Sequence, residues 1–315
     1  MTVLLACSGG GHLKQLHELV PRLGIEGLPR LWVTFDGGLS RSLLADEDVV
    51  YARHAVPRDA ANILRNAVQA AGLLRRRRFS MAVSTGASPA VSYLVQTALR
   101  GVPSHYIETA ARADGPSLTG RIMARTPGVR TYTQYPAWAS DGWSYGGSVF
   151  DAYRSDSPTP RATIRSAVVS LGTAESFGFR RLVEQLVPLL DGCEVTWQTG
   201  ATDVTGLPVA GREQVPHHEL AAAVAEADVV ISHAGTGAAI TALEQGKKPL
   251  LVPRRVAHGE HVDDHQTQIA GELARRGLAV HREAEDVDHA ALLEAASGRT
   301  ARIPAPPPFR LRPGR

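Results

Sequence analysis

A loop in the second half of the chain has the residue types of a phosphate-binding site. Residues 229–238 read VVISHAGTGA, an apolar stretch that ends in small and hydroxyl residues before an alanine-rich run. This order is typical of a buried parallel strand that leads through a loop into a helix. A helix start presents free N–H groups and partial positive charge, and small residues let a phosphate approach the backbone. Residues 232–237 therefore predict a diphosphate site.

Two residues in the first half are candidates for proton transfer. His12 follows the apolar stretch 3–7 and a run of three glycines. An imidazole, with an ordinary pKa of about 6.5, removes protons well at neutral pH, so we interpret His12 as a general base. The alternative is that His12 only positions an acceptor phosphate or caps the turn. Glu108 ends the apolar stretch 105–107 and is the second candidate, as the base, as a partner that orients His12, or as an acceptor ligand.

The elements that position these residues repeat along the chain. A strand followed by a Gly/Ser loop recurs at 81–89 and at 167–174, and strand and helix patterns alternate in both halves. This predicts an α/β fold of two Rossmann-like domains whose parallel sheets face each other across a cleft. The expected parts are an N-terminal domain at 1–150, a linker at 151–165, a C-terminal domain at 166–298 and a disordered, basic, proline-rich tail at 299–315.

Composition favours a soluble globular protein. Hydrophobic residues make up 43% and charged residues 21% of the chain, the net charge is +3, and no apolar stretch approaches the roughly 20 residues that span a bilayer. Cys7 and Cys193 are expected to be free, buried thiols, and no signal peptide is recognisable, so the expected location is the cytoplasm. The low aromatic content and the lack of a broad basic surface argue against nucleic-acid binding.

One segment is suited to a membrane surface. The arginine block 75–78 follows an amphipathic stretch, and one side of that stretch carries Ile63, Leu64, Ala67, Val68, Ala71 and Leu74. Such a face can rest on anionic lipid headgroups at the inner face of the plasma membrane. A solvated helix end, whose arginines complement the helix dipole, explains the block equally well.

Taken together, the motifs resemble family 28 glycosyltransferases of the GT-B fold. In the second half the matching stretches are 170–173 (SLGT), 197–200 (WQTG), 227–237 and 259–266 (GEHVDDHQ). The last is especially similar to bacterial exopolysaccharide and capsule transferases built from two subunits. In the first half, 8–12 (SGGGH), 106–109 (YIET), Arg112 and 116–121 (PSLTGR) resemble their other subunit. They also resemble the membrane-anchoring subunit of the eukaryotic enzyme that adds N-acetylglucosamine to dolichol diphosphate. The chain looks like a fusion of the two subunits.

The resemblance implies a UDP-sugar-dependent hexosyltransferase that inverts configuration at the transferred sugar. The sugar would be N-acetylglucosamine, glucuronic acid, galactose or glucose, and the acceptor a saccharide on a polyprenyl diphosphate, with no cofactor and no required metal. The donor would contact Gly172, Thr173, Gln198, Val215, His217, His233, Gly235, Thr236, Gly237, Thr241, Glu244, His265 and Gln266. The acceptor would contact Gly10, Gly11, Ser84, Gly86 and Arg112, with His12 and Glu108 catalytic. Two departures stand out: Thr241 replaces a ribose-binding glutamate, with Glu244 one turn later, and Gln15 replaces a glutamate of the eukaryotic-type subunit.

Other interpretations of the same motifs stay open. His261, Asp263 and Asp264 are residue types that also ligate metals. A sugar contact by His265 and Gln266, or N-capping of the next helix by one of the two aspartates, is the expected role of this loop. A UDP-sugar epimerase of the same fold, a non-catalytic UDP-sugar-binding partner of a membrane transferase, and a natural-product glycosyltransferase are the alternative functions. A dehydrogenase is disfavoured because the full G-x-G-x-x-G pattern is absent after residue 7.

Overall fold

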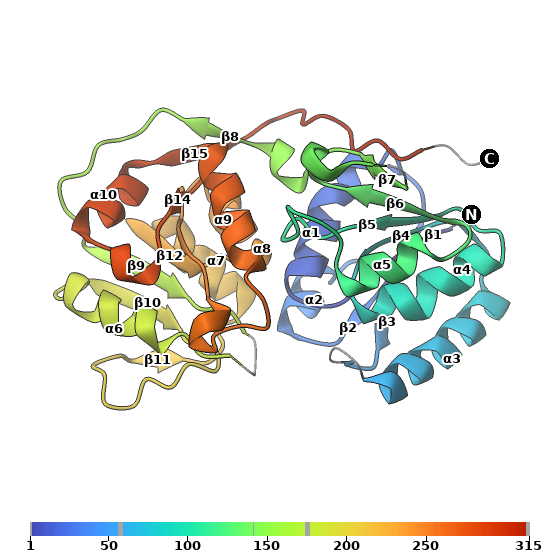
Figure 1. The fold of residues 1–315 in the computed structure, drawn as a ribbon, viewed down its shortest axis with the longest axis horizontal. Coiled ribbons are helices and arrows are strands. Elements are labelled where there is room, and N and C mark those ends of the chain that lie inside the picture. The colour runs from blue at the N-terminus through green and yellow to red at the C-terminus, as the bar shows by residue number, and fades with distance from the viewer. Residues whose placement is uncertain (1, 56–58, 141, 174–176, 313–315) are drawn as a thin grey trace. The chain divides into compact units, whose positions relative to one another are not determined.

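A computed structural model describes residues 2–55, 59–140, 142–173 and 177–312 of the chain (Figure 1). The chain divides into two compact units, Met1–Asp151 with Pro306–Arg315, and Ala152–Ala305. The strands of the first unit are β1 (Thr2–Cys7), β2 (Arg30–Phe35), β3 (Val49–Ala52), β4 (Phe79–Gly86), β5 (Ser104–Ile107), β6 (Val129–Thr133) and β7 (Trp143–Tyr145). Its helices are α1 (Gly11–Leu19), α2 (Gly38–Leu43), α3 (Ala60–Arg76), α4 (Val95–Leu99) and α5 (Leu118–Ala124), with short helical turns η1 (Val20–Arg22), η2 (Ala90–Leu94), η3 (Pro136–Trp138) and η4 (Val149–Ala152).

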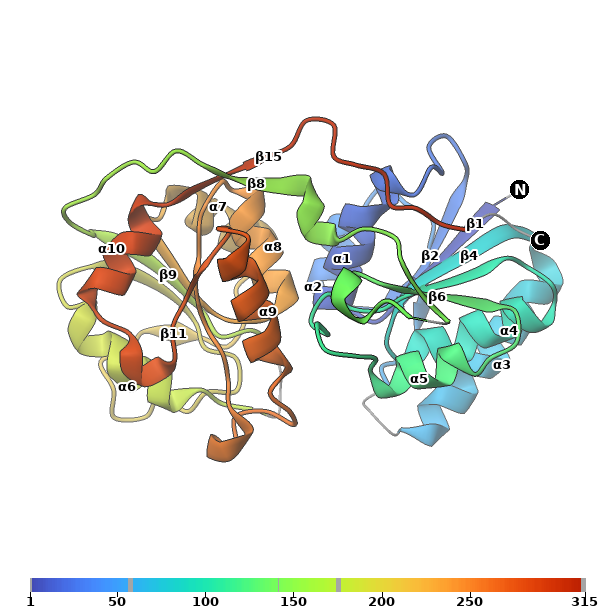
Figure 2. The same ribbon diagram turned by 45° about the horizontal axis from the view of Figure 1, so that its top comes forward.

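The first unit is a doubly wound parallel sheet. Within the described residues its strands are ordered β3-β2-β1-β4-β5-β6-β7, and every pairing is parallel. Helices α1 and α2 cover one face, and α3, α4 and α5 cover the other (Figures 1 and 2). The strand order reverses between β1 and β4, and the carboxyl ends of strands at such a switch point are where open α/β sheets bind ligands. The loops after β1 and β4 lie there, because Cys7 pairs with Gly86.

The second unit repeats this plan. Its strands are β8 (Tyr153–Asp156), β9 (Ser166–Ser170), β10 (Glu194–Gln198), β11 (Gly211–Arg212), β12 (Val229–His233), β13 (Leu250–Val252), β14 (Val280–His281) and β15 (Arg299–Arg302). Its helices are α6 (Arg180–Leu189), α7 (His217–Glu226), α8 (Thr236–Glu244), α9 (His265–Arg275) and α10 (His289–Ser297), with turns η5 (Val256–His258) and η6 (Ala284–Asp286). The described parallel sheet has the order β11-β10-β9-β12-β13-β14, so its switch point lies between β9 and β12.

The central strands are largely apolar because helices cover both faces of the sheet. In the second unit Val169 and Ile231 pack with α6 and α10, whereas Val168 and Val230 pack with α7 and α8 on the opposite face. A strand covered on both sides has no polar alternation, which is the pattern that predicted parallel sheets. None of the described helices is long and apolar enough to cross a membrane. Cys7 is a buried free thiol as expected, whereas Cys193 is half-buried.

Two predicted boundaries are wrong. The expected linker 151–165 contains β8, and the expected disordered tail begins with β15, which pairs antiparallel with β8. Further along, the side chain of Phe309 is buried, and its ring centroid lies 6.0 Å from that of Tyr132. The backbone N–H of Phe309 donates to the Arg22 carbonyl at 2.8 Å. Composition alone gave the wrong prediction for this segment, which is rich in proline and arginine. The pairing of β15 with β8 and the burial of Phe309 hold it in place. Residues 313–315 lie outside the described residues.

Candidate functional site

In the first unit, His12 lies at the switch point between β1 and β4. Its Nδ1 is 2.6 Å from the carbonyl oxygen of Thr85, and the Thr85 hydroxyl donates to the His12 carbonyl at 2.9 Å. A carbonyl only accepts, so Nδ1 carries the proton of the neutral ring and Nε2 is the nitrogen that can take one. This is the tautomer that a general base needs.

The glycines around His12 have specific steric roles. Gly10 caps α1 with φ +60°, and Gly86 has φ +103°, both values that favour glycine. A Cβ on Gly86 would lie 3.1 Å from the His12 ring, so the loop passes close to the imidazole. Ser84 is buried and its Oγ accepts the Gly86 N–H at 3.1 Å. Ser84 therefore shapes this loop from inside, whereas Gly10 and Gly11 form the start of α1 as predicted.

The structure argues against Glu108 as a base. The side chain is 1% exposed and accepts from the N–H groups of Thr109 at 3.0 Å and Ser117 at 2.9 Å. The hydroxyls of Ser117 and Tyr106 donate to it as well, at 3.0 Å and 3.2 Å. Burial raises the pKa of Glu108. Because protein donors occupy both carboxylate oxygens, Glu108 connects the end of β5 to the start of α5 instead of facing a substrate.

Gln15 and Arg112 lie in the same region of the first unit. The Gln15 amide donates to the Thr109 hydroxyl at 3.0 Å and accepts the Ala110 N–H at 2.7 Å. An amide does both and a carboxylate cannot donate, which accounts for glutamine at this place. Arg112 is half-buried in the loop after β5, and its carbonyl accepts from the Trp138 indole at 3.2 Å. Its predicted contact with an acceptor phosphate stays a prediction.

In the second unit, α8 starts at the switch point between β9 and β12. Gly235 is its N-cap and has no side chain to cap the helix, and the first helical bond runs from Ala239 to the Gly235 carbonyl at 3.0 Å. The N–H groups of Thr236, Gly237 and the following residue therefore have no helical acceptor. Such a helix start can bind an anion, and the predicted diphosphate contact stays a prediction.

His233 separates the two loops at this switch point. A Cβ on Gly172 would lie 2.8 Å from its Cε1, and a Cβ on Gly235 would overlap its Nε2 and lie 2.9 Å from its Cδ2. Its Nδ1 is 3.2 Å from the Ser170 carbonyl. Burial, and then the positive charge of Arg254, lower the pKa of His233 to about 3. The ring is therefore neutral at physiological pH and fills the space between the glycines, so it contributes no charge to a diphosphate.

Gln266 is buried at the start of α9, and its Oε1 accepts the N–H of Arg254 at 3.0 Å. This bond orients the amide so that its NH₂ group faces away from that backbone. Asp264 is the N-cap residue of α9 but makes no side-chain cap bond, and its carboxylate accepts the N–H of Val256 at 3.1 Å instead. Capping by an aspartate, one of the two expected roles of this loop, is therefore not found in the described residues.

Several other predicted donor ligands are used inside the unit. The Gln198 amide donates to the Ser170 hydroxyl at 3.0 Å and accepts the Val215 N–H at 3.2 Å. The Thr241 hydroxyl donates to the Gly237 carbonyl at 3.0 Å, one helical turn back. The Gln198 bonds connect the ends of β9 and β10 to the loop before α7, whereas the Thr241 bond lies within α8. The predicted donor contacts of these residues stay predictions. By contrast, Thr173 is exposed, and His217 and Glu244 are half-buried.

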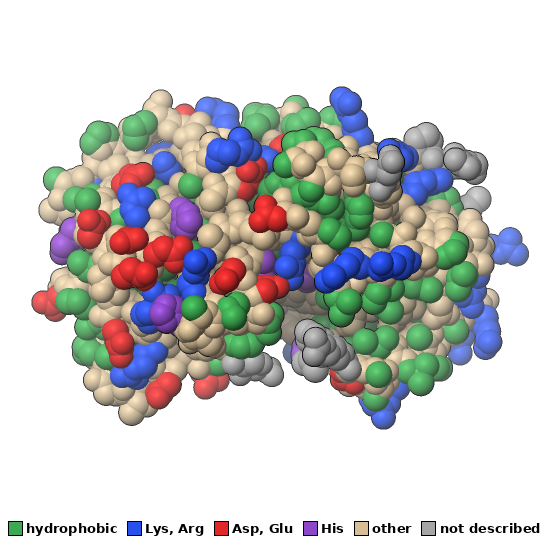
Figure 3. Space-filling model, viewed as in Figure 1, with side chains coloured by type: hydrophobic (Ala, Val, Ile, Leu, Met, Phe, Trp, Pro, Cys, Tyr) green, Lys and Arg blue, Asp and Glu red, His purple; other side chains and the backbone are tan. Residues whose placement is uncertain are grey.

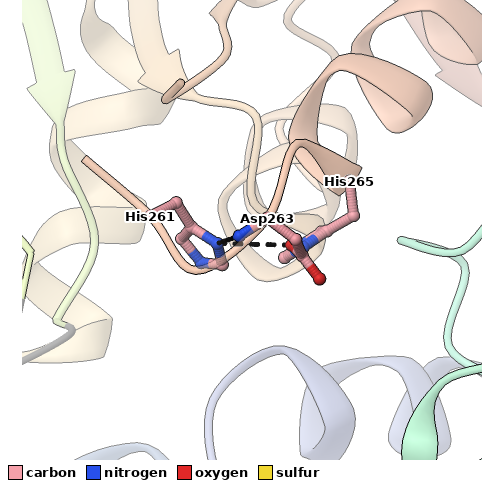
Figure 4. Close-up of side chains that lie close together, drawn as sticks. All are labelled: His261, Asp263 and His265. Carbon is pink, nitrogen blue, oxygen red and sulfur yellow. Dashed lines mark hydrogen bonds and ion pairs between the residues drawn. The ribbon is translucent and has the colours of Figure 1, made fainter. Parts of the chain in front are cut away.

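The loop before α9 brings together His261, Asp263 and His265 (Figure 4). Their ligand atoms lie within 4.8 Å of one another, and Asp263 contacts Nδ1 of both rings, at 3.4 Å for His261. Burial lowers the pKa of His261, which favours its neutral form. Two imidazoles and a carboxylate can hold a divalent ion. The contact with Asp263 also orients the ring of His265 at the start of α9, and the predicted sugar contact of His265 stays a prediction.

Sequence reasoning missed Arg254, which follows β13. The side chain is 2% exposed, and its Nη2 donates to the Leu171 carbonyl at 2.7 Å. The signal that could have found it is an arginine two residues after a buried strand, where a solvated charge is not expected.

Comparison with known proteins agrees with this architecture. Residues 167–303 match the Glycosyltransferase family 28 C-terminal domain. The UDP-N-acetylglucosamine–N-acetylmuramyl-(pentapeptide) pyrophosphoryl-undecaprenol N-acetylglucosamine transferase of Burkholderia orbicola is 25% identical over 328 residues, 95% of this chain and 87% of that protein. The UDP-N-acetylglucosamine transferase subunit ALG13 of Yarrowia lipolytica is 43% identical over 58 residues, 18% of this chain and 28% of that subunit. The crystal structure of MurG from Acinetobacter baumannii has a TM-score of 0.57 at 20% identity, covering 93% of this chain and 88% of that one.

Two Rossmann-like units in one chain, each built on a parallel sheet, form the GT-B fold. The chain is a glycosyltransferase whose residues 167–303, most of the second unit, match the C-terminal domain of family 28.

Proposed function

We propose that this glycosyltransferase moves a sugar from a UDP-sugar to a saccharide carried on a polyprenyl diphosphate, with inversion at the transferred carbon. The observation that carries the proposal is the start of α8, where Gly235 caps the helix without a side chain. Its N–H groups and the helix dipole stabilise the negative charge that grows on the leaving diphosphate. The relatives named above are N-acetylglucosamine transferases, so N-acetylglucosamine is the first sugar to test.

The acceptor side of the proposal rests on the first unit. His12 takes the proton of the acceptor hydroxyl through Nε2, and the Thr85 carbonyl holds the ring in the required tautomer. The start of α1 and Arg112 bind the acceptor diphosphate.

The proposal needs no metal, because N–H donors and a helix dipole supply the charge stabilisation. We expect UDP to stabilise the protein in a buffer that contains EDTA, by about 2.7 kcal/mol at 100 times its dissociation constant. Thermal shift measures this, with ADP as the matched control nucleotide. Transfer is measured as acceptor-dependent UDP release from UDP-N-acetylglucosamine, in the same buffer, with a lipid-linked saccharide as the acceptor.

Three outcomes would contradict parts of this scheme. If neither UDP nor any UDP-sugar stabilises the chain, the donor assignment is wrong. If EDTA abolishes transfer and Zn²⁺ or Mg²⁺ restores it, the metal-free mechanism is wrong, and the His261–Asp263–His265 cluster becomes the first site to mutate. If a UDP-sugar epimer forms without acceptor, the enzyme is an epimerase instead.

We also propose that the layer of α3, α4 and α5 docks the enzyme on the inner face of the plasma membrane. On α3, Leu64 and Val68 are 67% and 68% exposed, and the exposed residues Leu118 and Leu99 lie on α5 and α4. Figure 3 shows basic side chains over α5 with hydrophobic ones beside them. Apolar side chains that enter the headgroup boundary, next to arginines that attract anionic lipid, are the two contributions that peripheral binding requires.

A double change of Leu64→Ser with Val68→Ser tests the docking surface. Burying each of these side chains contributes about 1.5 kcal/mol or more, so we expect at least about tenfold weaker binding to phosphatidylglycerol vesicles. Co-sedimentation measures the binding. The matched control is Val262→Ser, an equally exposed apolar residue of the second unit, which should leave vesicle binding unchanged. Equal losses in both variants would rule out a specific role for this face.

A further inference from the structure

Arg254 crosses the carboxyl edge of the second sheet beneath the loop of the proposed diphosphate site. The residue follows β13, yet its guanidinium donates to the carbonyl of Leu171, directly after β9, at 2.7 Å. Strand β12 lies between β9 and β13 in the sheet. The side chain therefore passes the end of β12, from which His233 and Gly235 lead into α8. The guanidinium carbon lies 5.8 Å from the ring centroid of buried Phe179.

The charge of Arg254 is not matched by an ion pair in the described part of the chain. No carboxylate described there forms a salt bridge with it, and its Nε has no hydrogen-bond partner. The acid that acts on it electrostatically is Glu260. Glu260 is itself held by Arg181 at 3.0 Å and by the N–H of Arg255 at 3.0 Å. Removing a charge from water without a partner costs several kcal/mol, so this arginine is unfavourable for stability alone.

The groups around Arg254 do not compensate it either. A protonated His233 would repel Arg254, and burial holds the pKa of His233 at about 3. Burial lowers the pKa of Arg254 to about 10, which still leaves it protonated at neutral pH. The carboxyl edge between β9 and β13 thus holds the positive charge of Arg254 beside the neutral His233 ring, an environment that an anion would complete.

We propose that Arg254 is a positioning residue for the donor diphosphate. Its guanidinium holds the Leu171–Gly172 turn in place and supplies, from beneath the loop, the positive charge that balances the phosphates bound at the start of α8. This inference rests on the proposed function, because it names the counter-charge of that same site. The charge of Arg254 is buried and therefore weakly screened, so its effect on binding must grow with the number of phosphates on the ligand.

Arg254→Met is the variant that separates charge from packing. Methionine fills part of the buried volume without a charge, so we expect the free protein to melt at or above the wild-type temperature. We expect at least about tenfold weaker binding of UDP, a smaller loss for UMP and no change for uridine, all measured by calorimetry. Arg254→Lys keeps the charge and should recover most of the UDP affinity. The control Arg276→Met removes the C-cap arginine of α9, which pairs with Glu272 at 2.6 Å, and should leave all three affinities unchanged.

Several outcomes would overturn the inference. Unchanged UDP affinity in Arg254→Met would remove Arg254 from the site, and an equal loss for uridine and UDP would show that it acts only through the fold. If Arg254→Met does not fold, the Arg254→Lys variant is the test. Its ratio of UDP affinity to uridine affinity must then equal that of the wild type. A wild-type protein that binds no UDP contradicts the proposed function itself, a result distinct from all of these.

Discussion

Replacing His12 with alanine will slow sugar transfer by about 10²–10⁴-fold and leave UDP affinity unchanged. The imidazole is held by the Thr85 carbonyl at 2.6 Å in the tautomer that accepts a proton at Nε2, so its removal deletes the proposed base. UDP affinity should not change, because the proposed donor site lies in the second unit. Turnover at saturating substrate and calorimetric UDP binding measure the two effects, and the acidic limb of the pH–rate profile should flatten with the rate loss.

Glu108→Gln is the informative comparison, since Glu108 is the other acid–base candidate in the sequence. Its carboxylate accepts four protein hydrogen bonds, and a glutamine NH₂ group cannot accept those at one of the two oxygens. We therefore expect a lower melting temperature, with the shape of the pH–rate profile retained. A stable Glu108→Gln protein that loses the acidic limb, beside an active His12→Ala protein, would reverse the two roles.

Replacing Gly235 with alanine will weaken UDP binding by about 10–100-fold. A Cβ at residue 235 would overlap the His233 ring. The ring also lies against Gly172, so it cannot move away from residue 235 without displacing the loop after β9. Overpacking of this kind costs about 1–3 kcal/mol, and it displaces the N–H groups at the start of α8, the proposed diphosphate site. Calorimetry with UDP measures the loss of affinity, and thermal unfolding measures the accompanying loss of stability.

Gly271→Ala is the matched control. Gly271 lies inside α9 of the same unit, and a Cβ there would meet nothing within 4 Å. Alanine is the better helix former by about 0.5–1 kcal/mol, so this variant should melt slightly higher and bind UDP normally. Normal UDP binding by Gly235→Ala would mean that the diphosphate does not sit at this helix start.

The sequence by itself determined where the two switch points lie. The apolar stretches at 3–7, 81–86, 167–171 and 229–233 are the central strands, and each leads into a glycine-containing loop. Runs of this kind are local, and a strand buried on both faces has few alternatives, so the fold class follows from pattern alone. The positions of His12 and Thr236 follow as well, because each is the first or second residue of a helix after such a strand.

Only the tertiary structure decided which polar side chains are free to meet a ligand. Glu108 and Gln198 are both adjacent to predicted loops. The carboxylate of Glu108 nevertheless accepts hydrogen bonds from Ser117 and Tyr106. The amide of Gln198 likewise bonds to Ser170 and Val215. Whether a polar group is satisfied depends on partners that folding brings from elsewhere in the chain, and spacing does not encode them.

The same reason explains the two largest surprises. Arg254 reaches a carbonyl 83 residues earlier in the chain, and the proline-rich C-terminal segment is ordered by pairing of β15 with β8 and by burial of Phe309. Local composition indicates whether a segment or a side chain could stay exposed to solvent. Long-range burial and hydrogen bonding determine whether it is, and these exist only once the strands are assembled.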